Sequence, residues 1–182
     1  MTQHTAHGRA RRALLASLLV GAGAVATKSH ALAAPDKRSL TFFHTHTREQ
    51  LSVTYYADGK FIGDALLEID YLLRDFRTGD VCQIDAMLLH TLHDLNQATG
   101  GDGTFEVVSA YRSPATNASL QEHTEGVATN SMHLQGRAID VRITGCDTAR
   151  LRDAAVALQR GGVGYYPTSD FIHLDTGSVR TW

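Results

Sequence analysis

The chain has 182 residues, 43% of them hydrophobic and 20% charged, which is the composition of a globular protein rather than of a disordered or fibrous one. Its first 33 residues contain four basic residues and no acidic one, so the other 149 residues carry 13 basic and 19 acidic side chains. The resulting net charge of −6 argues against non-specific nucleic-acid binding, which requires positive charge to neutralise phosphates. We therefore expect no nucleic-acid partner.

Residues 1–33 have the three parts of a secretory signal peptide. Basic residues come first, the apolar run 13–20 follows, and small residues lead up to Ala33. A membrane anchor is the alternative, but a spanning helix needs about 20 apolar residues and this run is shorter. We therefore expect cleavage after Ala33, which leaves a mature domain over residues 34–182 and no integral membrane segment.

The export signal also predicts the compartment. Arg11 and Arg12 precede the apolar run, which resembles a twin-arginine signal, whose route exports folded proteins. We therefore expect the protein in the periplasm or cell envelope of a bacterium. Because that compartment is oxidising, the two cysteines, Cys82 and Cys146, could form a disulfide, although two buried free thiols fit the sequence equally well.

The hydrophobic pattern of the mature part predicts both helices and short strands. Residues 40–56 alternate in places between apolar and polar, which favours a hairpin that turns near residues 47–49. Helical spacing and capping residues predict four helices: residues 62–76, a helix capped by Asp85 that runs to Leu95, a helix capped by Asn117, and residues 151–158, closed by Gly161 and Gly162. Short apolar strands are predicted at residues 105–109, 138–143, 163–166 and 171–175. This order favours an α+β fold with a small, largely antiparallel sheet and helices packed on it.

Three residues in the second half of the chain form a set of candidate metal ligands. His133 lies in a predicted loop, Asp140 lies on the strand that follows, and His173 comes 33 residues later on another strand. Two imidazoles and one carboxylate are the ligands that a catalytic zinc uses when its fourth position is left to water. The ion would lower the pKa of that water toward 7 and polarise a carbonyl group. We therefore predict one zinc ion per chain.

Hydrolysis of this kind also needs a carboxylate that takes a proton from water and passes it to the leaving amine. Asp170 and Asp175 both lie close to His173 in the sequence. On a regular strand Asp175 shares a face with His173, whereas Asp170 would lie at the start of the strand. From the residues alone, both remain candidates for the base.

Four short motifs carry a resemblance to a known family. They are Ser109-Ala-Tyr-Arg-Ser, the stretch from Ser131 to Asp140, Gly-Gly-Val-Gly-Tyr-Tyr-Pro at residues 161–167 and Phe-Ile-His-Leu-Asp-Thr-Gly at residues 171–177. With these motifs, nearly the whole mature chain resembles the YcbK/MepK-type murein endopeptidases, which belong to the zinc D-Ala-D-Ala metallopeptidase (LAS) superfamily.

The resemblance implies a fold, a reaction and roles for individual residues. A LAS-type fold would carry zinc at the face of its sheet, on the residues that match the ligands of the family: His133, Asp140 and His173. Arg112 would lie by the metal and bind substrate. Many relatives in the superfamily have an acidic residue three positions before the last ligand, so Asp170 is the preferred base, and Asp175 is the alternative or a partner of a histidine ligand. The implied substrate is the peptide cross-link between peptidoglycan stem peptides, cut by an endopeptidase rather than a carboxypeptidase.

Two alternatives of other classes fit parts of the same pattern. A catalytically inactive, zinc-containing peptidoglycan-binding module would keep the three ligands but would need no base. A non-haem iron oxygenase could use His173 and Asp175 together with a histidine further along the chain. No histidine follows Asp175, and we therefore favour the hydrolase.

The remaining histidines and a pair of tyrosines receive no functional assignment. His44 and His46 have a metal-like spacing that strand alternation explains equally well. His123 falls between Arg112 and His133 in the sequence, where it could line the cleft. The others are expected on the solvent side of a helix or in packing: His90 and His93, Tyr165 and Tyr166.

Overall fold

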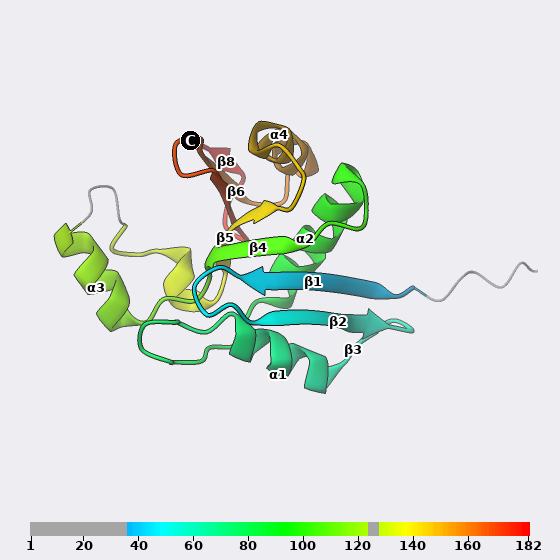
Figure 1. Ribbon diagram of the computed structural model, residues 1–182, viewed down its shortest axis with the longest axis horizontal. Coiled ribbons are helices and arrows are strands. Elements are labelled where there is room, and N and C mark those ends of the chain that lie inside the picture. The colour runs from blue at the N-terminus through cyan, green and yellow to red at the C-terminus, as the bar shows by residue number, and fades with distance from the viewer. Residues whose placement is uncertain (1–35, 124–127) are drawn as a thin grey trace, which may run out of the picture. The chain divides into compact units, whose positions relative to one another are not determined.

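The computed structural model describes residues 36–123 and 128–182 of the chain (Figure 1). The predicted signal peptide, residues 1–33, lies outside these ranges, so its cleavage stays a prediction. Within the described ranges, no helix combines the length and the apolar character that crossing a membrane requires.

An open sheet forms the centre of the described part of the chain (Figure 1). Its strands are β1 (Arg38–His44), β2 (Gln50–Ala57), β3 (Lys60–Phe61), β4 (Phe105–Ser109), β5 (Ala138–Ile143), β6 (Gly162–Tyr166), β7 (Phe171–Asp175) and β8 (Arg180–Thr181). They stand in the order β3-β2-β1-β4-β5-β7-β6-β8. Most neighbours are antiparallel, but β1 pairs with β4, and β6 with β8, in parallel. The α+β class and the mostly antiparallel pairing are confirmed, whereas the sheet is mixed and larger than the small one expected.

Helices pack against this sheet along most of its width. They are α1 (Gly63–Leu72), α2 (Ala86–Thr99), α3 (Pro114–His123), the 3-10 helix η1 (Met132–Gln135) and α4 (Thr148–Leu158). Helix α1 packs against β2 and α2 against β1, while α4 contacts β5, β6 and β7 and also lies against α2. These contacts enclose the apolar core between the sheet and its helices.

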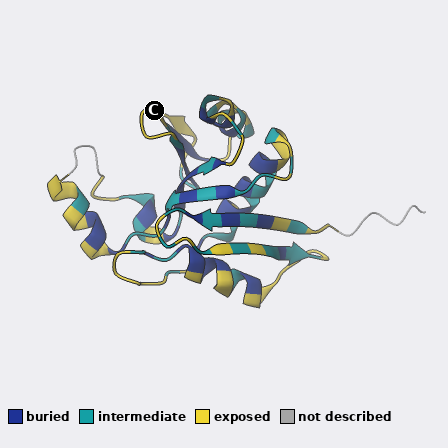
Figure 2. Ribbon diagram, viewed as in Figure 1, coloured by how far each residue is buried: buried dark blue, intermediate teal, exposed yellow. Residues whose placement is uncertain are grey.

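The alternation of side chains along β5 and β7 separates this core from a second, polar face. Ile139 on β5, and Ile172 and Leu174 on β7, belong to the buried core cluster. Figure 2 shows that buried positions run through the strands of the sheet. Successive side chains of a strand point to opposite faces. Asp140 and His173, which are paired directly across the two strands, therefore both point away from that core. The register of a single strand pair thus brings two of the predicted ligands together.

The predicted hairpin and the four predicted strands are confirmed. The predicted cap of α2 is confirmed as well, because Asp85 accepts a hydrogen bond from the backbone N–H of Met87 at 2.9 Å.

The start of α3 was predicted wrongly. It begins at Pro114 and is capped by Ser113, whose Oγ accepts from the N–H of Thr116 at 3.2 Å, while Asn117 lies buried inside the helix. Proline suits the first helical position because the missing N–H has no partner there anyway.

Two helix ends also differ from the prediction. Helix α1 stops at Leu72 rather than continuing to residue 76. Helix α4 is closed by Gln159, which takes the left-handed conformation (φ 53°) that the sequence pattern assigned to the glycines after it. The strands β3 and β8 were missed because two residues are too few for any periodicity to appear.

Cys82 and Cys146 do not form a disulfide. Both are free thiols, and both are partly exposed. The disulfide considered from the sequence is therefore wrong, and the alternative of two free thiols holds, although neither thiol is fully buried.

Candidate active site

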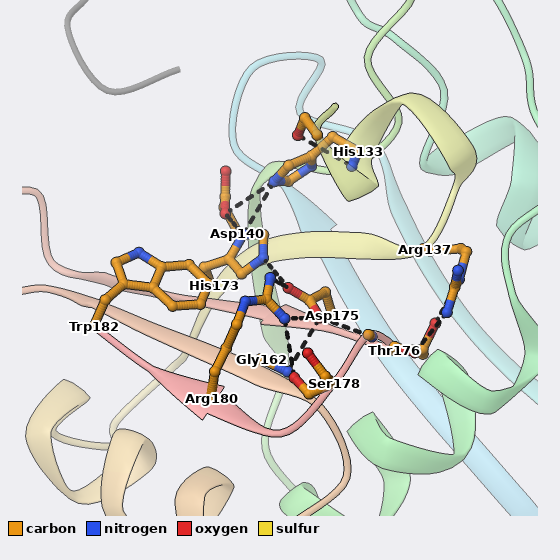
Figure 3. A network of polar contacts seen from close by, with 12 residues as sticks. His133, Arg137, Asp140, Gly162, His173, Asp175, Thr176, Ser178, Arg180 and Trp182 are labelled. Atoms are coloured by element: carbon orange, nitrogen blue, oxygen red, sulfur yellow. Dashed lines mark hydrogen bonds and ion pairs between the residues drawn. The ribbon is translucent and has the colours of Figure 1, made fainter. Parts of the chain in front are cut away.

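The three predicted metal ligands converge in space although they come from separate elements (Figure 3). His133 lies on η1, Asp140 on β5 and His173 on β7. Nε2 of His133 is 3.2 Å from Nδ1 of His173. Oδ1 of Asp140 lies 3.0 Å from that Nδ1 and 3.3 Å from that Nε2. In the described ranges, this is the one group of at least three histidine, cysteine or acidic side chains that could hold a metal ion.

The spacing of these three atoms fits a tetrahedral ion. Zinc bonds to nitrogen and oxygen are about 2.0–2.1 Å long, so neighbouring ligand atoms of a tetrahedron lie about 3.3 Å apart. The observed separations of 3.2, 3.0 and 3.3 Å are close to that value. The chemistry of the set, two imidazoles and one carboxylate, also suits zinc. The residues present therefore fit the implied metal.

Local sequence holds His133 at the cluster. Ser131 caps η1, its Oγ accepting from the N–H of His133 at 3.3 Å. Gly136 ends η1 in the left-handed conformation, with φ of 64°. A β-carbon on this glycine would collide with the carbonyl oxygen of Gln83. The tight turn after His133 therefore requires glycine for two reasons, its backbone conformation and the close approach of the segment before α2.

Hydrogen bonds on the outer side of each imidazole fix which nitrogen faces the cluster. Nδ1 of His133 donates to the carbonyl oxygen of Ala110 at 2.6 Å, because a carbonyl can only accept. Nε2 of His173 donates to Oδ2 of Asp175 at 2.9 Å. The other nitrogen of each ring faces Asp140 and is the one that a metal ion could take, which is the arrangement that metal-binding histidines share.

The two oxygens of Asp140 have separate partners. Oδ1 faces the two imidazoles, while Oδ2 accepts a hydrogen bond from Nη2 of Arg112 at 2.7 Å. Nε of Arg112 donates to Oγ of Ser109 at 3.1 Å. An irregularity in the pairing of β4 with β5, between Val107 and Ser109, places Ser109 opposite Asp140. Arg112, for which the resemblance implied substrate binding, is thus held at the cluster.

The charges of the cluster shift the pKa values of its members. Burial alone would raise the pKa of Asp140, but the charge of His133 and hydrogen bonds from both histidines outweigh burial and hold this pKa well below its usual range. Burial lowers the pKa of His133, against the attraction of Asp140. Burial also opposes the charged form of His173, but hydrogen bonds to Asp140 and Asp175 raise its pKa overall. Asp140 is therefore a carboxylate, the form in which it can bind a cation.

Asp175 is a fully buried carboxylate whose hydrogen-bonding capacity is filled. Its five donors are Nε2 of His173 (2.9 Å), Nη1 and Nη2 of Arg180 (3.1 and 2.6 Å), and the backbone N–H groups of Gly162 (3.1 Å) and Gly177 (2.8 Å). Burial acts to raise its pKa, yet the bonds from His173 and Arg180 lower it below its ordinary value. Asp175 thus suits the role of a partner that orients His173 better than that of a group that accepts a proton from water.

Asp170 is not brought to the cluster. It lies in the turn between β6 and β7 in the left-handed conformation, with φ of 52°, and 63% of its side chain is exposed. Its carboxylate bonds to the hydroxyl of Thr148 and lies 3.9 Å from Nη1 of Arg142. Its assignment as the base therefore depends on its place in the sequence and on the resemblance.

A pocket of about 390 Å³ opens at the cluster. Its lining includes the three candidate ligands, Arg112 and Asp175, and also several residues to which the sequence analysis gave no role: Ala128, Asn130, Ser131, Met132, Tyr166, Phe171, Arg180 and Trp182. Arg180 and Trp182 were missed because they belong to the two-residue strand β8 and the residue after it. Arg180 and Trp182 stand two positions apart shortly after Asp175, and this spacing, which puts two side chains on one face of a strand, could have indicated them.

Comparison with known proteins assigns the family. The model of the family described as "Peptidoglycan L,D-endopeptidase MepK" matches residues 32–182. The chain belongs to this family. A relative from Haemophilus influenzae, named "Probable peptidoglycan L,D-endopeptidase MepK", is 43% identical over 149 residues, which are 81% of this chain and 80% of the relative. The peptidoglycan L,D-endopeptidase MepK of Escherichia coli K12 is 36% identical over 175 residues, 94% of this chain and 96% of the relative. No solved structure matches the chain.

Membership of the MepK family confirms the resemblance seen in the four motifs. It also sets aside the iron oxygenase, because the match extends over the part of the chain that carries all three candidate ligands.

His44 and His46 do not form a metal site. His44 is fully buried, and its Nδ1 accepts from the N–H of His46 at 3.3 Å. The ring of His46 stacks on Phe76, with centroids 4.1 Å apart. Packing on Phe76 accounts for the position of His46. The explanation by strand alternation is wrong, because β1 ends at His44 and His46 lies in the turn that follows.

Two other histidines lie elsewhere than expected. His123 is exposed at the end of α3, where its Nδ1 contacts the carbonyl oxygen of Ser119 at 2.7 Å, and it does not line the pocket. His90 was expected on the solvent side of α2 but is only partly exposed, with its Nδ1 2.9 Å from the hydroxyl of Tyr55 in the hairpin. The sequence could not show this because the hairpin that covers His90 is distant along the chain.

Proposed function

We propose that this chain is a zinc-dependent peptidoglycan endopeptidase that hydrolyses peptide cross-links between murein stem peptides. The observation that carries the proposal is the triangle of ligand atoms of His133, Asp140 and His173, at separations near 3.2 Å, in a member of the MepK family. The name of that family supports an L,D-bond as the one that is cut. We propose that the enzyme acts in the periplasm after removal of residues 1–33.

The ligand cluster would hold one zinc ion. Bound there, zinc would supply Lewis-acid chemistry, polarising a substrate carbonyl and making a water molecule more acidic. His133 and His173 would each contribute one nitrogen and Asp140 its Oδ1. Ala110 and Asp175 accept hydrogen bonds from the two imidazole rings and so hold them in the orientation that metal binding needs. The ligands are therefore positioned by the chain before an ion binds.

Arg112 would bind the substrate beside the ion. Its Nε and Nη2 are taken by Ser109 and Asp140, and Nη1 has no partner in the described part of the chain. This N–H group can donate a charge-assisted hydrogen bond to the carbonyl oxygen of the scissile bond or to a carboxylate of the stem peptide. The bond to Asp140 fixes the guanidinium, so little conformational freedom is lost on binding.

Asp170 is our proposed general base and, after attack, the acid that protonates the leaving amine. The carboxylates that line the pocket, Asp140 and Asp175, are both engaged, the first by Arg112 and the imidazoles and the second by five donors. Asp170 lies in the turn between Tyr166 and Phe171, which both line the pocket. To act, its carboxylate must leave the hydroxyl of Thr148 and turn toward the cluster.

The test is the action of the purified, zinc-loaded mature chain on sacculi, with muropeptides analysed by mass spectrometry. We expect cross-linked dimers to disappear without shortening of monomers, and we expect a chelator or His133→Ala to abolish the effect. His123→Ala, on an exposed histidine outside the pocket, is the matched control. Unchanged dimers with the zinc-loaded chain would overturn the proposal in favour of a peptidoglycan-binding module.

A further inference from the structure

Three aromatic side chains form one wall of the pocket beside the candidate zinc ligands. Tyr166, Phe171 and Trp182 all line it. Trp182 lies next to His173, with ring centroids 5.1 Å apart (Figure 3). Tyr166 stacks on Phe171 at 4.7 Å with an interplanar angle of 18°. The indole Nε1–H of Trp182 donates to the hydroxyl oxygen of Tyr166 at 2.9 Å, so the wall is a connected unit.

The indole is fixed in place by the backbone around it. The N–H of Trp182 donates to the carbonyl oxygen of Val163 at 3.2 Å, and its own carbonyl accepts from the N–H of Tyr165 at 3.0 Å. The ring lies over Gly164, where a β-carbon would come within 2.6 Å of the indole. Glycine at this position therefore makes room for the ring. The guanidinium of Arg180 covers the indole at 5.0 Å from its centroid.

The bond from Trp182 leaves the hydroxyl hydrogen of Tyr166 available. A phenol is both a donor and an acceptor, and Trp182 uses it as an acceptor because indole can only donate. No other hydrogen bond of this hydroxyl is formed within the described residues. Accepting one hydrogen bond also strengthens the donation of the next. Tyr166 therefore presents an oriented donor at the pocket that holds the ligand cluster.

The neighbouring Tyr165 has a different environment. Its ring lies under the guanidinium of Arg152, 4.7 Å from its centroid, and it packs against the core. It does not line the pocket. The sequence gave the two tyrosines the same interpretation, namely packing, and only the alternation along β6 distinguishes them.

The polar groups of the pocket select for a ligand rich in acceptor oxygens. Asp140 and Asp175 have their oxygens occupied, whereas Arg112 retains a free Nη1 and Tyr166 a free hydroxyl hydrogen. Murein stem peptides offer such acceptors in their amide carbonyls and carboxylates. We propose that the hydroxyl of Tyr166, positioned by Trp182, donates a hydrogen bond to an acceptor oxygen of the stem peptide. This inference rests on the proposed function, because it takes its ligand from there.

The test measures binding rather than turnover, using the mature chain kept metal-free with a chelator. Trp182 is the single tryptophan of the chain and lies in the pocket, so its fluorescence reports on occupancy. The probes are a purified cross-linked muropeptide dimer and the peptide-free disaccharide of the same glycan. The variants are Tyr166→Phe, which removes only the donor, and Tyr165→Phe as the matched control.

We expect the dimer to bind about three- to tenfold more weakly to Tyr166→Phe, the range for loss of one hydrogen bond, and unchanged to Tyr165→Phe. Trp182→Phe, measured by calorimetry, should weaken binding less, and Tyr166→Phe with Trp182→Phe together should lose no more than Tyr166→Phe alone. Equal affinity of the two tyrosine variants, no binding by the wild type, or equal binding of the peptide-free disaccharide would each overturn the inference. A chain that binds the dimer as described but never hydrolyses it with zinc would instead refute the proposed function alone.

Discussion

Asp175 accepts a hydrogen bond from Nε2 of His173 at 2.9 Å, and this contact decides which nitrogen of that ring faces Asp140. The two residues stand two positions apart on β7 and share the polar face of the sheet. Arg180 donates to both oxygens of the same carboxylate, at 2.6 Å to the oxygen that His173 contacts and at 3.1 Å to the other. The orientation of one candidate ligand is therefore set by a chain of contacts that begins at the edge strand β8.

Asp175→Asn should weaken zinc binding while leaving the fold in place. The change keeps the size of the side chain but removes the charge that orients and polarises His173, and losses of about 10- to 100-fold in metal affinity follow such changes. Competition with a fluorescent chelator measures the affinity. Asp153→Asn, at an exposed carboxylate that pairs with Arg152, serves as control. Equal zinc affinity of the two variants would show that Asp175 does not act on the metal site.

Asp170→Asn should separate metal binding from turnover. Because the carboxylate is exposed and contacts Thr148 and Arg142 rather than a candidate ligand, we expect normal zinc affinity. We expect most of the hydrolysis rate to be lost, about 100-fold or more. Muropeptide turnover and chelator competition are measured on the same preparation. A variant that retains full activity would assign the proton transfer to another group.

Gly136→Ala should destabilise the protein more than a strained backbone alone explains. Gly59 is also left-handed (φ 78°) but has open space around it, so Gly59→Ala should cost only about 1–2 kcal/mol of unfolding free energy. At Gly136 the added methyl also meets the carbonyl of Gln83, and we expect roughly 3 kcal/mol or more. Urea unfolding of both variants gives the comparison. Similar losses of unfolding free energy in the two variants would mean that the turn at Gly136 and the segment at Gln83 move apart without a further loss of stability.

His44 should make the stability depend on pH. Burial first, and then the nearby charges of His46 and Arg74, lower its pKa from 6.5 to about 4 against the opposing charge of Glu49. Protonation therefore favours the unfolded chain, so the contribution of this residue is complete above pH 6.5 and declines as the pH falls toward 4. A shift of this size corresponds to about 3 kcal/mol.

The measurement compares urea unfolding at pH 7 and pH 4.5 for the wild type and for His44→Asn, which keeps an acceptor for the N–H of His46 but cannot be protonated. We expect the variant to lose less stability on acidification than the wild type. An identical loss in both proteins would place the acid sensitivity elsewhere.

The candidate ligands could be predicted because the chemistry of zinc restricts which residue types bind it and in what number. The sequence placed Asp140 and His173 on two different strands, and the structure pairs those strands in a register that sets the two residues side by side. Strand alternation likewise predicted that His173 and Asp175 would share a face. These conclusions needed only local periodicity and the ligand preferences of one metal.

The orientation of Asp170 and the contribution of Trp182 could not be predicted in this way. Asp170 has a left-handed backbone, which sequence patterns assign to glycine or asparagine, and this directs its side chain to Thr148. Trp182 reaches the pocket only because β8 pairs in parallel with β6, a contact between segments too short to show a pattern. Both features depend on tertiary contacts that no single segment encodes.

The placement of Arg180 and Trp182 also affects how the pocket would respond to local motion. Strand β8 is exposed, two residues long and at the rim of the sheet. Short rim strands detach at a much lower free energy than the core unfolds. Transient detachment of β8 would withdraw the indole and the guanidinium together while leaving the helices intact. The fraction of molecules with a complete pocket is thus coupled to fraying of the sheet at β8. Amide hydrogen exchange at Trp182 would measure this fraying.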